Sequence, residues 1–225
     1  MPTKQPAATR IADSSRKLPA RSQWLPSPSG ATYVPDEFGK RSNPARPRIR
    51  SIVRTAYHEA GHAVLSSAIC DTPREVTIAR RRSEYSGRTM IMGQFAQPNV
   101  LVQVYLAGLA ADHLLVKRIA DPLKFAVRGT SFLRSACLMN CDIRCAVKCV
   151  QQLSSSKRHK NTLKNLMRFY AITRDSLRAT WPAVVSVADA LLIQRTLDRD
   201  ALFEALDAHD IYHAVIGVQK AYGEM

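Results

Sequence analysis

Long hydrophobic runs are missing from this chain of 225 residues. Its most apolar segment, residues 100–111, contains Gln103 and is shorter than the roughly 18 apolar residues that a membrane-spanning helix needs. The first residues also lack the apolar core of a secretory signal peptide. The sequence therefore predicts a cytoplasmic protein without a membrane span.

Cysteine and acidic side chains are also scarce. Five cysteines, an odd number, do not describe a disulfide framework and fit a reducing compartment. Only 18 Asp and Glu stand against 33 Lys and Arg, which leaves a net charge of +15. Residues 1–50 hold ten of the basic residues, three of the acids and eight of the twelve prolines. This composition predicts a disordered basic arm rich in Pro, Ser and Arg.

The basic excess raises the question of nucleic-acid binding. Almost half of it lies in the 1–50 arm, and the remaining basic runs, at 80–82 and 157–160, are short. Short charge runs are usually solvated surface. No GxxxxGK[ST] phosphate loop is present in the sequence either. Nucleic acid is therefore not expected as a partner.

Apolar residues recur with a helical period through most of the sequence after residue 50. The segment 51–70 is rich in small residues and predicts a buried helix. Pro182 and Asp198 are both suited to helix starts, and Asp198 is suited to act as an N-cap. Further helices are predicted at about 99–118, 131–153, 157–179, 183–195 and 199–208.

Two short strands, 75–80 and 88–94, are predicted after the first helix, joined by a turn that contains Ser86-Gly87. Beyond residue 208 the pattern is weak, and only a C-terminal tail is predicted over 209–225. The predicted fold class is therefore mainly α, with a small β element.

One string carries the chemistry of a metal site, an HExxH motif formed by His58, Glu59 and His62. Four residues make about one helical turn, so both imidazoles project from one face and can bind one Zn²⁺. Glu59 lies beside them, where its carboxylate can take a proton from a metal-bound water. The composition of the chain makes only about 0.004 such strings expected by chance. A structural histidine pair with Glu59 in a salt bridge is the alternative interpretation.

A catalytic zinc needs a third protein ligand. The metzincin spacing fails, because Leu65 and Ala68 stand where that pattern requires Gly and His. Glu75 and Glu84 are within range along the chain, but they fall in the predicted strand and turn segment. Asp142 is an isolated carboxylate on a predicted helix of small and apolar residues, where an unpaired charge is costly. A bound metal would give Asp142 a partner.

Five strings, in order along the chain, resemble segments of the zinc peptidase domain of the FtsH family of AAA proteases. The string AYHEAGHAV, at 56–64, resembles the active-site helix of that family. The other four resemble its "kVTI", "LaGraAEe", "DLxxA" and "aLLexeTLd" segments and lie at 75–78, 105–112, 142–146 and 190–198. The matches are collinear over 51–208, which is therefore expected to be a zinc metallopeptidase domain with a helical FtsH-peptidase-like zincin fold.

The resemblance implies that His58, His62 and Asp142 bind zinc and that Glu59 is the general base. It implies an endopeptidase that hydrolyses peptide bonds of unfolded or flexible proteins through a zinc-activated water. It also implies that 87–90 is an edge to which an extended substrate can add as a strand.

The family's ATPase and membrane helices have no counterpart in this sequence. The expected partners are protein or peptide substrates and a homo-oligomer, a hexamer by resemblance, or a separate AAA ATPase. The alternative function is a catalytically weak or inactive zinc-binding interaction or regulatory module that associates with full-length AAA proteases.

Three further patterns are interpreted as structural. The histidines at 209 and 213 are one helical turn apart, but no Glu or third ligand accompanies them, so they are expected at the surface or an interface. The aromatic residues Tyr170 and Trp181 are expected in the core. The four cysteines spaced four residues apart are expected to be small buried residues that pack the helix of Asp142. They are Cys137, Cys141, Cys145 and Cys149.

Overall fold

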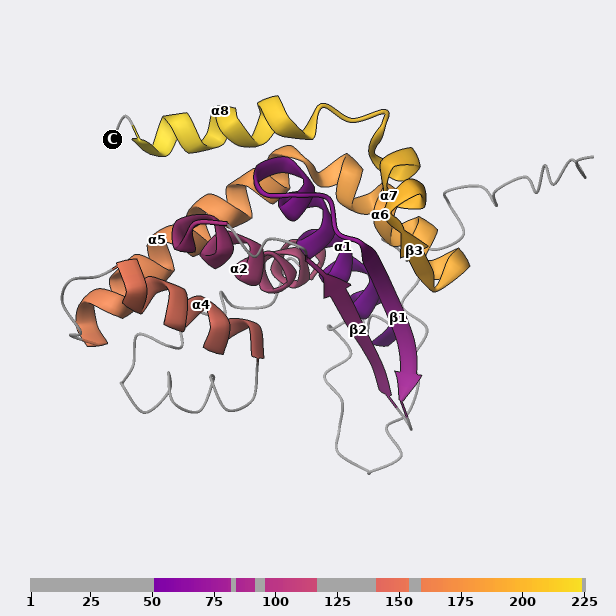
Figure 1. The fold of residues 1–225 in the computed structure, drawn as a ribbon, viewed down its shortest axis with the longest axis horizontal. Coiled ribbons are helices and arrows are strands. Elements are labelled where there is room, and N and C mark those ends of the chain that lie inside the picture. The colour runs from indigo at the N-terminus through magenta and orange to yellow at the C-terminus, as the bar shows by residue number, and fades with distance from the viewer. Residues whose placement is uncertain (1–50, 82–83, 92–95, 117–140, 154–158, 224–225) are drawn as a thin grey trace, which may run out of the picture. The chain divides into compact units, whose positions relative to one another are not determined.

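Seven helices and three short strands make up the part of the chain that the structure describes (Figure 1). The structure is a computed structural model, and it describes residues 51–81, 84–91, 96–116, 141–153 and 159–223. The predicted arm over 1–50 lies outside the described residues. The elements are α1 (Ser51–Ile69), β1 (Glu75–Arg81), β2 (Glu84–Met90), α2 (Pro98–Leu115), α4 (Cys141–Leu153), α5 (His159–Ala179), α6 (Trp181–Gln194), β3 (Thr196–Asp198), α7 (Arg199–Leu206) and α8 (Ile211–Gly223). The predicted mainly helical fold with a small β element is confirmed.

Helix α1 lies at the centre of the described fold, between α2, α6 and the sheet. Ala56, Ala60 and Ala63 on this helix are fully buried, and such small side chains let neighbouring helices approach closely. Gly61 shows how close that approach is. A Cβ at this position would lie 2.7 Å from the Cβ of Ala111 and 2.8 Å from the carbonyl oxygen of Ala107, both on α2.

The three strands form one antiparallel sheet in the order β2-β1-β3. The predicted second strand is present, but its predicted start at 88 is wrong, because β2 begins at Glu84 and ends at Met90. Residues 92–94 of that prediction lie outside the described residues. Ser86 and Gly87 lie inside its ladder, with Gly87 opposite Ile78 on β1. Glycine in a strand often indicates the close approach of another group. Here that group is the side chain of Glu59, and the glycine therefore does not form a turn.

Strand β3 was not predicted, and it pairs with β1 on the side opposite β2. It follows α6 directly, after Arg195, which has a positive φ of 67° and ends that helix. The carbonyl oxygen of Arg195 accepts a hydrogen bond from the amide of Ile78 at 2.8 Å. Asp198 then caps α7 as predicted, its Oδ1 accepting from the amide of Ala201 at 2.9 Å.

Helices α5 and α6 meet at Thr180, and Pro182 occupies the first turn of α6, as predicted. Tyr170 on α5 is buried, as expected, and Trp181 is partly buried and stacks on Tyr57 with 5.6 Å between ring centroids. Among the described residues, no single helix has both the length and the apolarity to cross a membrane. Only α5 and α6 taken together meet that test of length and composition, as a pair bent by 78°.

The segment predicted as a C-terminal tail contains a further helix, α8, which packs against α5 and α1. Its apolar pattern is weak because Val215 is its one fully buried residue in the described segment. Polar contacts add to this packing: the hydroxyl of Tyr222 donates to Asp175 Oδ2 at 2.7 Å, and Arg168 Nη2 donates to the carbonyl oxygen of Tyr222 at 3.4 Å.

Candidate metal centre

Three predicted metal ligands meet at one point of the fold. His58 and His62 lie one turn apart on α1, and Asp142 lies in the first turn of α4. The Nε2 atoms of the two histidines are 3.3 Å apart, and Asp142 Oδ2 lies 3.3 Å from His58 Nε2 and 3.6 Å from His62 Nε2. A tetrahedral metal with bonds near 2.0–2.1 Å separates its ligand atoms by about 3.3 Å. The three donors therefore have the spacing that a four-coordinate ion requires.

Each histidine is oriented by a partner on its other ring nitrogen. His62 Nδ1 lies 2.7 Å from the carbonyl oxygen of Val104 on α2. Because a carbonyl only accepts, Nδ1 carries the proton and Nε2 keeps a lone pair for a metal. His58 Nδ1 faces Asp112 Oδ2 at 3.3 Å, and this oxygen also accepts from Arg54 Nη2 at 2.9 Å. Such outer partners fix the tautomer and ring orientation of metal-binding histidines.

Gly108 on α2 leaves open the space in front of the two imidazoles. A Cβ built there would lie 2.4 Å from His58 Nε2 and 2.5 Å from His62 Nε2. Any other residue at this position would therefore compete with a ligand for both histidines. The spacing of the donors, the orientation of the rings and this open face together fit a bound metal ion.

The charges around the histidines favour a cation. Burial lowers the pKa of His58, but hydrogen bonds to Asp112 and Asp142 outweigh it and raise this pKa to about 10. Burial raises the pKa of Asp142, but its hydrogen bonds to His58 and His62 outweigh that effect and hold this pKa far below its usual range. A metal ion can take the place of the proton at such a site, because metal ligands bind in their deprotonated forms.

Glu59 projects from α1 toward the sheet and is only 6% exposed. Its Oε2 accepts a hydrogen bond from Thr89 Oγ1 on β2 at 2.7 Å. Its carboxylate also lies against Gly87, where a Cβ would come within 2.3 Å of Oε1. The charge of Glu59 contributes to the raised pKa of His58. The general base predicted from the HExxH motif is thus buried beside the metal-ligating group, between α1 and the edge strand.

Of the other acids considered as third ligands, Glu75 does not belong to this group. Glu75 lies on β1, where its Oε1 accepts from Thr77 Oγ1 at 3.1 Å. The backbone of Glu84 belongs to β2, and its side chain lies outside the described residues. Within the described ranges, His58, His62 and Asp142 form the one cluster of three or more His, Cys, Asp or Glu side chains that could hold an ion. Two imidazoles and a carboxylate suit zinc but also other divalent metals.

The residues interpreted as structural are separate from this site. Cys137 lies outside the described residues, and of the remaining three on the predicted face only Cys149 is buried, while Cys145 is half-buried and Cys141 exposed. His209 contacts Ser186 Oγ through Nε2 at 2.9 Å, and His213 contacts Asp210 through Nδ1.

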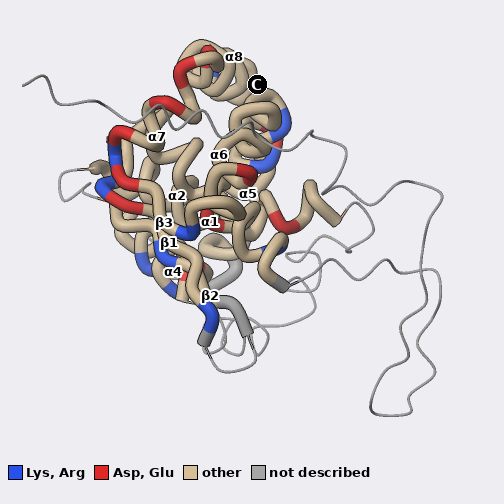
Figure 2. Tube along the Cα trace, turned by 90° about the vertical axis from the view of Figure 1, so that its right-hand side faces the viewer, with Lys and Arg blue, Asp and Glu red and all other residues tan. Residues whose placement is uncertain are grey.

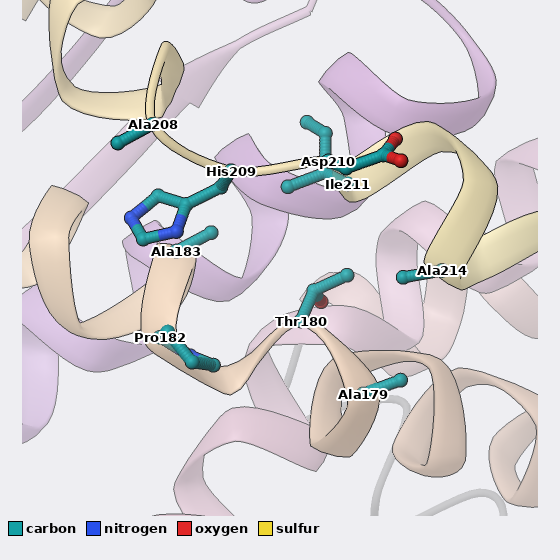
Figure 3. A pocket seen from close by; sticks show the side chains of 9 residues that line it. All are labelled: Ala179, Thr180, Pro182, Ala183, Ala208, His209, Asp210, Ile211 and Ala214. Carbon is teal, nitrogen blue, oxygen red and sulfur yellow. The ribbon is translucent and has the colours of Figure 1, made fainter.

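A small cavity of about 160 Å³ lies between the start of α6 and the connection from α7 to α8 (Figure 3). Thr180, His209 and Asp210 are its polar lining residues, and the rest of the lining is formed by alanines, Pro182 and Ile211. It shares no residue with the metal-ligating group. The described basic side chains of the two long strands, Arg80 on β1 and Arg88 on β2, are exposed, which fits solvated surface. Figure 2 marks the Lys and Arg positions of the described chain in blue.

No protein-family model matches this chain, and no curated protein matches it. The contacts of Asp112 with His58 and of Thr89 with Glu59 were not predicted, although Thr89 belongs to 87–90, the expected edge for substrate addition. Asp112 lies within the string that resembles the "LaGraAEe" segment and is an acid on an otherwise apolar helix, the same sequence feature that singled out Asp142. Thr89 has no comparable feature, because its contact depends on the strand register.

Proposed function

We propose that this protein is a zinc-dependent metalloendopeptidase that resembles the peptidase domain of the FtsH family. The observation that supports this proposal is the meeting of His58, His62 and Asp142 beside a buried Glu59. Two histidines and one carboxylate leave one tetrahedral position open, which is the pattern of catalytic zinc sites rather than structural ones.

The residues have complementary tasks in peptide hydrolysis. A zinc ion bound at His58, His62 and Asp142 would supply Lewis acidity toward water and a peptide carbonyl. Glu59 accepts a proton from the attacking water on its carboxylate and later gives a proton to the amine that leaves. Val104 and Asp112 hold the two imidazole rings in place throughout, because each contacts a nitrogen that faces away from the ligand cluster.

The outer edge of the sheet supports the proposal that the substrate is a protein in an extended conformation. In the described sheet β2 has β1 on one side and no strand on the other, so among the described residues its outer backbone groups have no strand partner and can pair with an extended chain. Thr89, which contacts Glu59, lies on this same strand. A peptide paired along β2 would therefore pass beside the general base. Pairing through the backbone requires an extended segment and reads few side chains, so unfolded or flexible chains are the proposed substrates.

Other parts of the proposal rest on the family resemblance alone. They are assembly into a homo-oligomer, a hexamer by resemblance, or a separate AAA ATPase that unfolds substrates. A cytoplasmic location is proposed from the lack of a long apolar run and of a signal-peptide core, and from the five cysteines. The same resemblance supports the alternative function, a zinc-binding module that has little or no catalytic activity and associates with full-length AAA proteases.

The deciding experiment compares the wild type with Glu59→Gln on casein, an unfolded substrate, and measures the zinc content of both proteins. We expect about one zinc in each protein and cleavage by the wild type, with a loss of at least 100-fold in Glu59→Gln, because the general base is gone. Equal cleavage by the two proteins would refute the catalytic assignment. Stoichiometric zinc without cleavage by the wild type would favour the module.

A further inference from the structure

The buried carboxylate of Glu59 has one described side-chain partner, the hydroxyl of Thr89. Thr89 lies opposite Val76 in the ladder of β1 and β2, and Val76 is buried in the core. Residues opposite each other in an antiparallel pair point to the same face of the sheet. The register of β2 therefore directs the Thr89 side chain inward, to α1.

We propose that Thr89 is a positioning residue for the general base: its hydroxyl holds Glu59 Oε2 and leaves Oε1 to accept the proton. This inference rests on the proposed peptidase function. Threonine suits the task because its branched Cβ restricts the side chain to few rotamers, so the donor has a defined direction. Glutamate has three side-chain torsions and needs an external contact to keep one geometry.

Gly87 is the second part of this arrangement. It lies two residues before Thr89 and therefore on the same face of the strand. A Cβ there would lie 2.2 Å from Glu59 Cγ and 2.5 Å from Cδ, so the absent side chain is the space that the carboxylate occupies. Thr89 then holds one oxygen, and the backbone of Gly87 lies against the rest of the group. Thr89 and Gly87 together restrict the buried Glu59 side chain to one of the several rotamers that it could otherwise adopt.

Edge strand β2 thus has two roles in the proposed reaction. Its outer edge is the proposed site of substrate pairing, while its inward side chain at Thr89 orients the base. The geometry of the base relative to the substrate is then set within one strand. A misplacement of about 1 Å in such an arrangement can reduce turnover by about 100-fold without weakening substrate binding.

The test is a set of three variants of the full chain, assayed with casein and an internally quenched peptide. Thr89→Val keeps the shape of the side chain and removes the donor, whereas Thr89→Ser keeps the donor. Thr77→Val is the matched control, because it removes a second Thr to Glu hydrogen bond in the same sheet, the one to Glu75. We expect kcat to fall by about 10- to 100-fold in Thr89→Val with KM within about twofold of the wild type. Thr89→Ser should recover most of kcat, and Thr77→Val should match the wild type.

A second measurement separates failure of this inference from failure of the proposed function. Crystal structures of wild type, Thr89→Val and Thr89→Ser show the Glu59 carboxylate whether or not the protein cleaves casein. We expect it to leave the Gly87 backbone in Thr89→Val and to stay in Thr89→Ser. An unmoved carboxylate in Thr89→Val, or a kcat as low in Thr89→Ser as in Thr89→Val, would overturn the role of Thr89. Absence of cleavage by the wild type would refute the peptidase function instead.

Discussion

A single oxygen of Asp112 connects the candidate metal centre to the surface of the protein. Oδ2 contacts His58 Nδ1 and also accepts from Arg54, whose side chain is 54% exposed. The contact of a carboxylate with the far nitrogen of a metal-binding histidine increases the basicity of that histidine. The Arg54 guanidinium competes for the same oxygen, so the strength of His58 as a ligand depends on the balance between the two.

Replacing Asp112 with Asn should test this contact. The amide keeps the shape of the side chain but removes the charge, so we expect zinc affinity to fall by about 10- to 100-fold. Competition with a chromophoric chelator measures the affinity. Asp175→Asn is the control, since Asp175 contacts α8 and no metal ligand. Equal affinities in wild type and Asp112→Asn would show that the carboxylate does not support His58.

Replacing Asp142 with Asn removes a predicted ligand itself and should have the larger effect. We expect zinc affinity to fall further than in Asp112→Asn, because a neutral amide oxygen is a poor replacement for a carboxylate at zinc. The same chelator competition, run on both variants, gives the order. If Asp142→Asn binds zinc as tightly as the wild type, the third ligand lies elsewhere in the chain.

The space that Gly108 leaves open leads to a prediction for which a second glycine of the chain, Gly217, is the control. Gly108→Ala places a Cβ within 2.6 Å of three imidazole atoms and should abolish metal binding. Gly217→Ala on α8 meets no atom within 4 Å, so it should leave metal binding unchanged and stabilise the fold by about 0.5–1 kcal/mol. Zinc titration and urea unfolding of both variants measure the two effects. Full metal binding by Gly108→Ala would contradict the proposed position of the ion.

Among the elements, α8 shows most clearly how polar contacts complete a weak apolar face. Asp175 on α5 accepts from the Tyr222 hydroxyl and from Arg174 and Arg178. Burial raises the pKa of Asp175, but the hydrogen bonds from Arg174 and Tyr222 outweigh it, so this pKa lies below its usual range. A carboxyl group with a lowered folded-state pKa stabilises the fold above its unfolded-state pKa, near 3.9, and this contribution is lost as the pH falls through the folded-state value.

The docking of α8 should therefore weaken in acid. We expect the free energy of unfolding to decrease between about pH 5 and pH 2, and to decrease less in Asp175→Asn, which has no charge to lose there. Urea unfolding across this range measures both. Tyr222→Phe should lower stability by about 1 kcal/mol at pH 7, the usual contribution of one hydrogen bond. Identical pH profiles for wild type and Asp175→Asn would show that Asp175 does not hold the helix.

The elements also show which parts of the fold were predictable. The 3.6-residue period located α1, α2 and α5 to α7, because each buries apolar side chains that recur at helical spacing. It missed α8, whose one fully buried side chain is too weak a pattern, and β3, whose three residues are too few to show any period. The predicted start of β2 was wrong because Ser86-Gly87 is a common turn pair, and nothing local reveals that Gly87 faces Glu59.

The residues of the candidate site can also be divided into those that the sequence predicts and those that it does not. His58, Glu59 and His62 follow from spacing within one helix, and Asp142 from its isolation among small and apolar residues. Thr89 could not be predicted, since its role depends on strand register and on the packing of the sheet against α1. Sequence periodicity identifies side chains that share one face of a single helix or strand, whereas contacts between elements can be identified only when the fold is known.

At the scale of the whole molecule, a bound metal would connect α1 to α4, two helices that are separated along the chain by β1, β2, α2 and the residues up to 140. A ligand that binds only the folded protein stabilises it, by about 2.7 kcal/mol when its concentration is 100 times its Kd. Removing zinc with a chelator should therefore lower the melting temperature of the wild type, and calorimetry measures this. In Asp142→Asn, removal of zinc should lower the melting temperature by less than it does in the wild type. An unchanged melting temperature after removal of the metal would contradict a metal that joins the two helices.

The pairing of β3 with β1 has a consequence for biosynthesis. Strand β1 leaves the ribosome soon after the HExxH helix, but its partner β3 is translated about 120 residues later, at a typical rate of about 5–20 residues per second. Asp142 is likewise translated long after His58. A nascent chain that exposes the two histidines therefore has neither its third ligand nor a finished sheet. The sheet and the candidate metal centre can therefore be completed only after β3 has been translated, and the two histidines are made long before the site that they belong to.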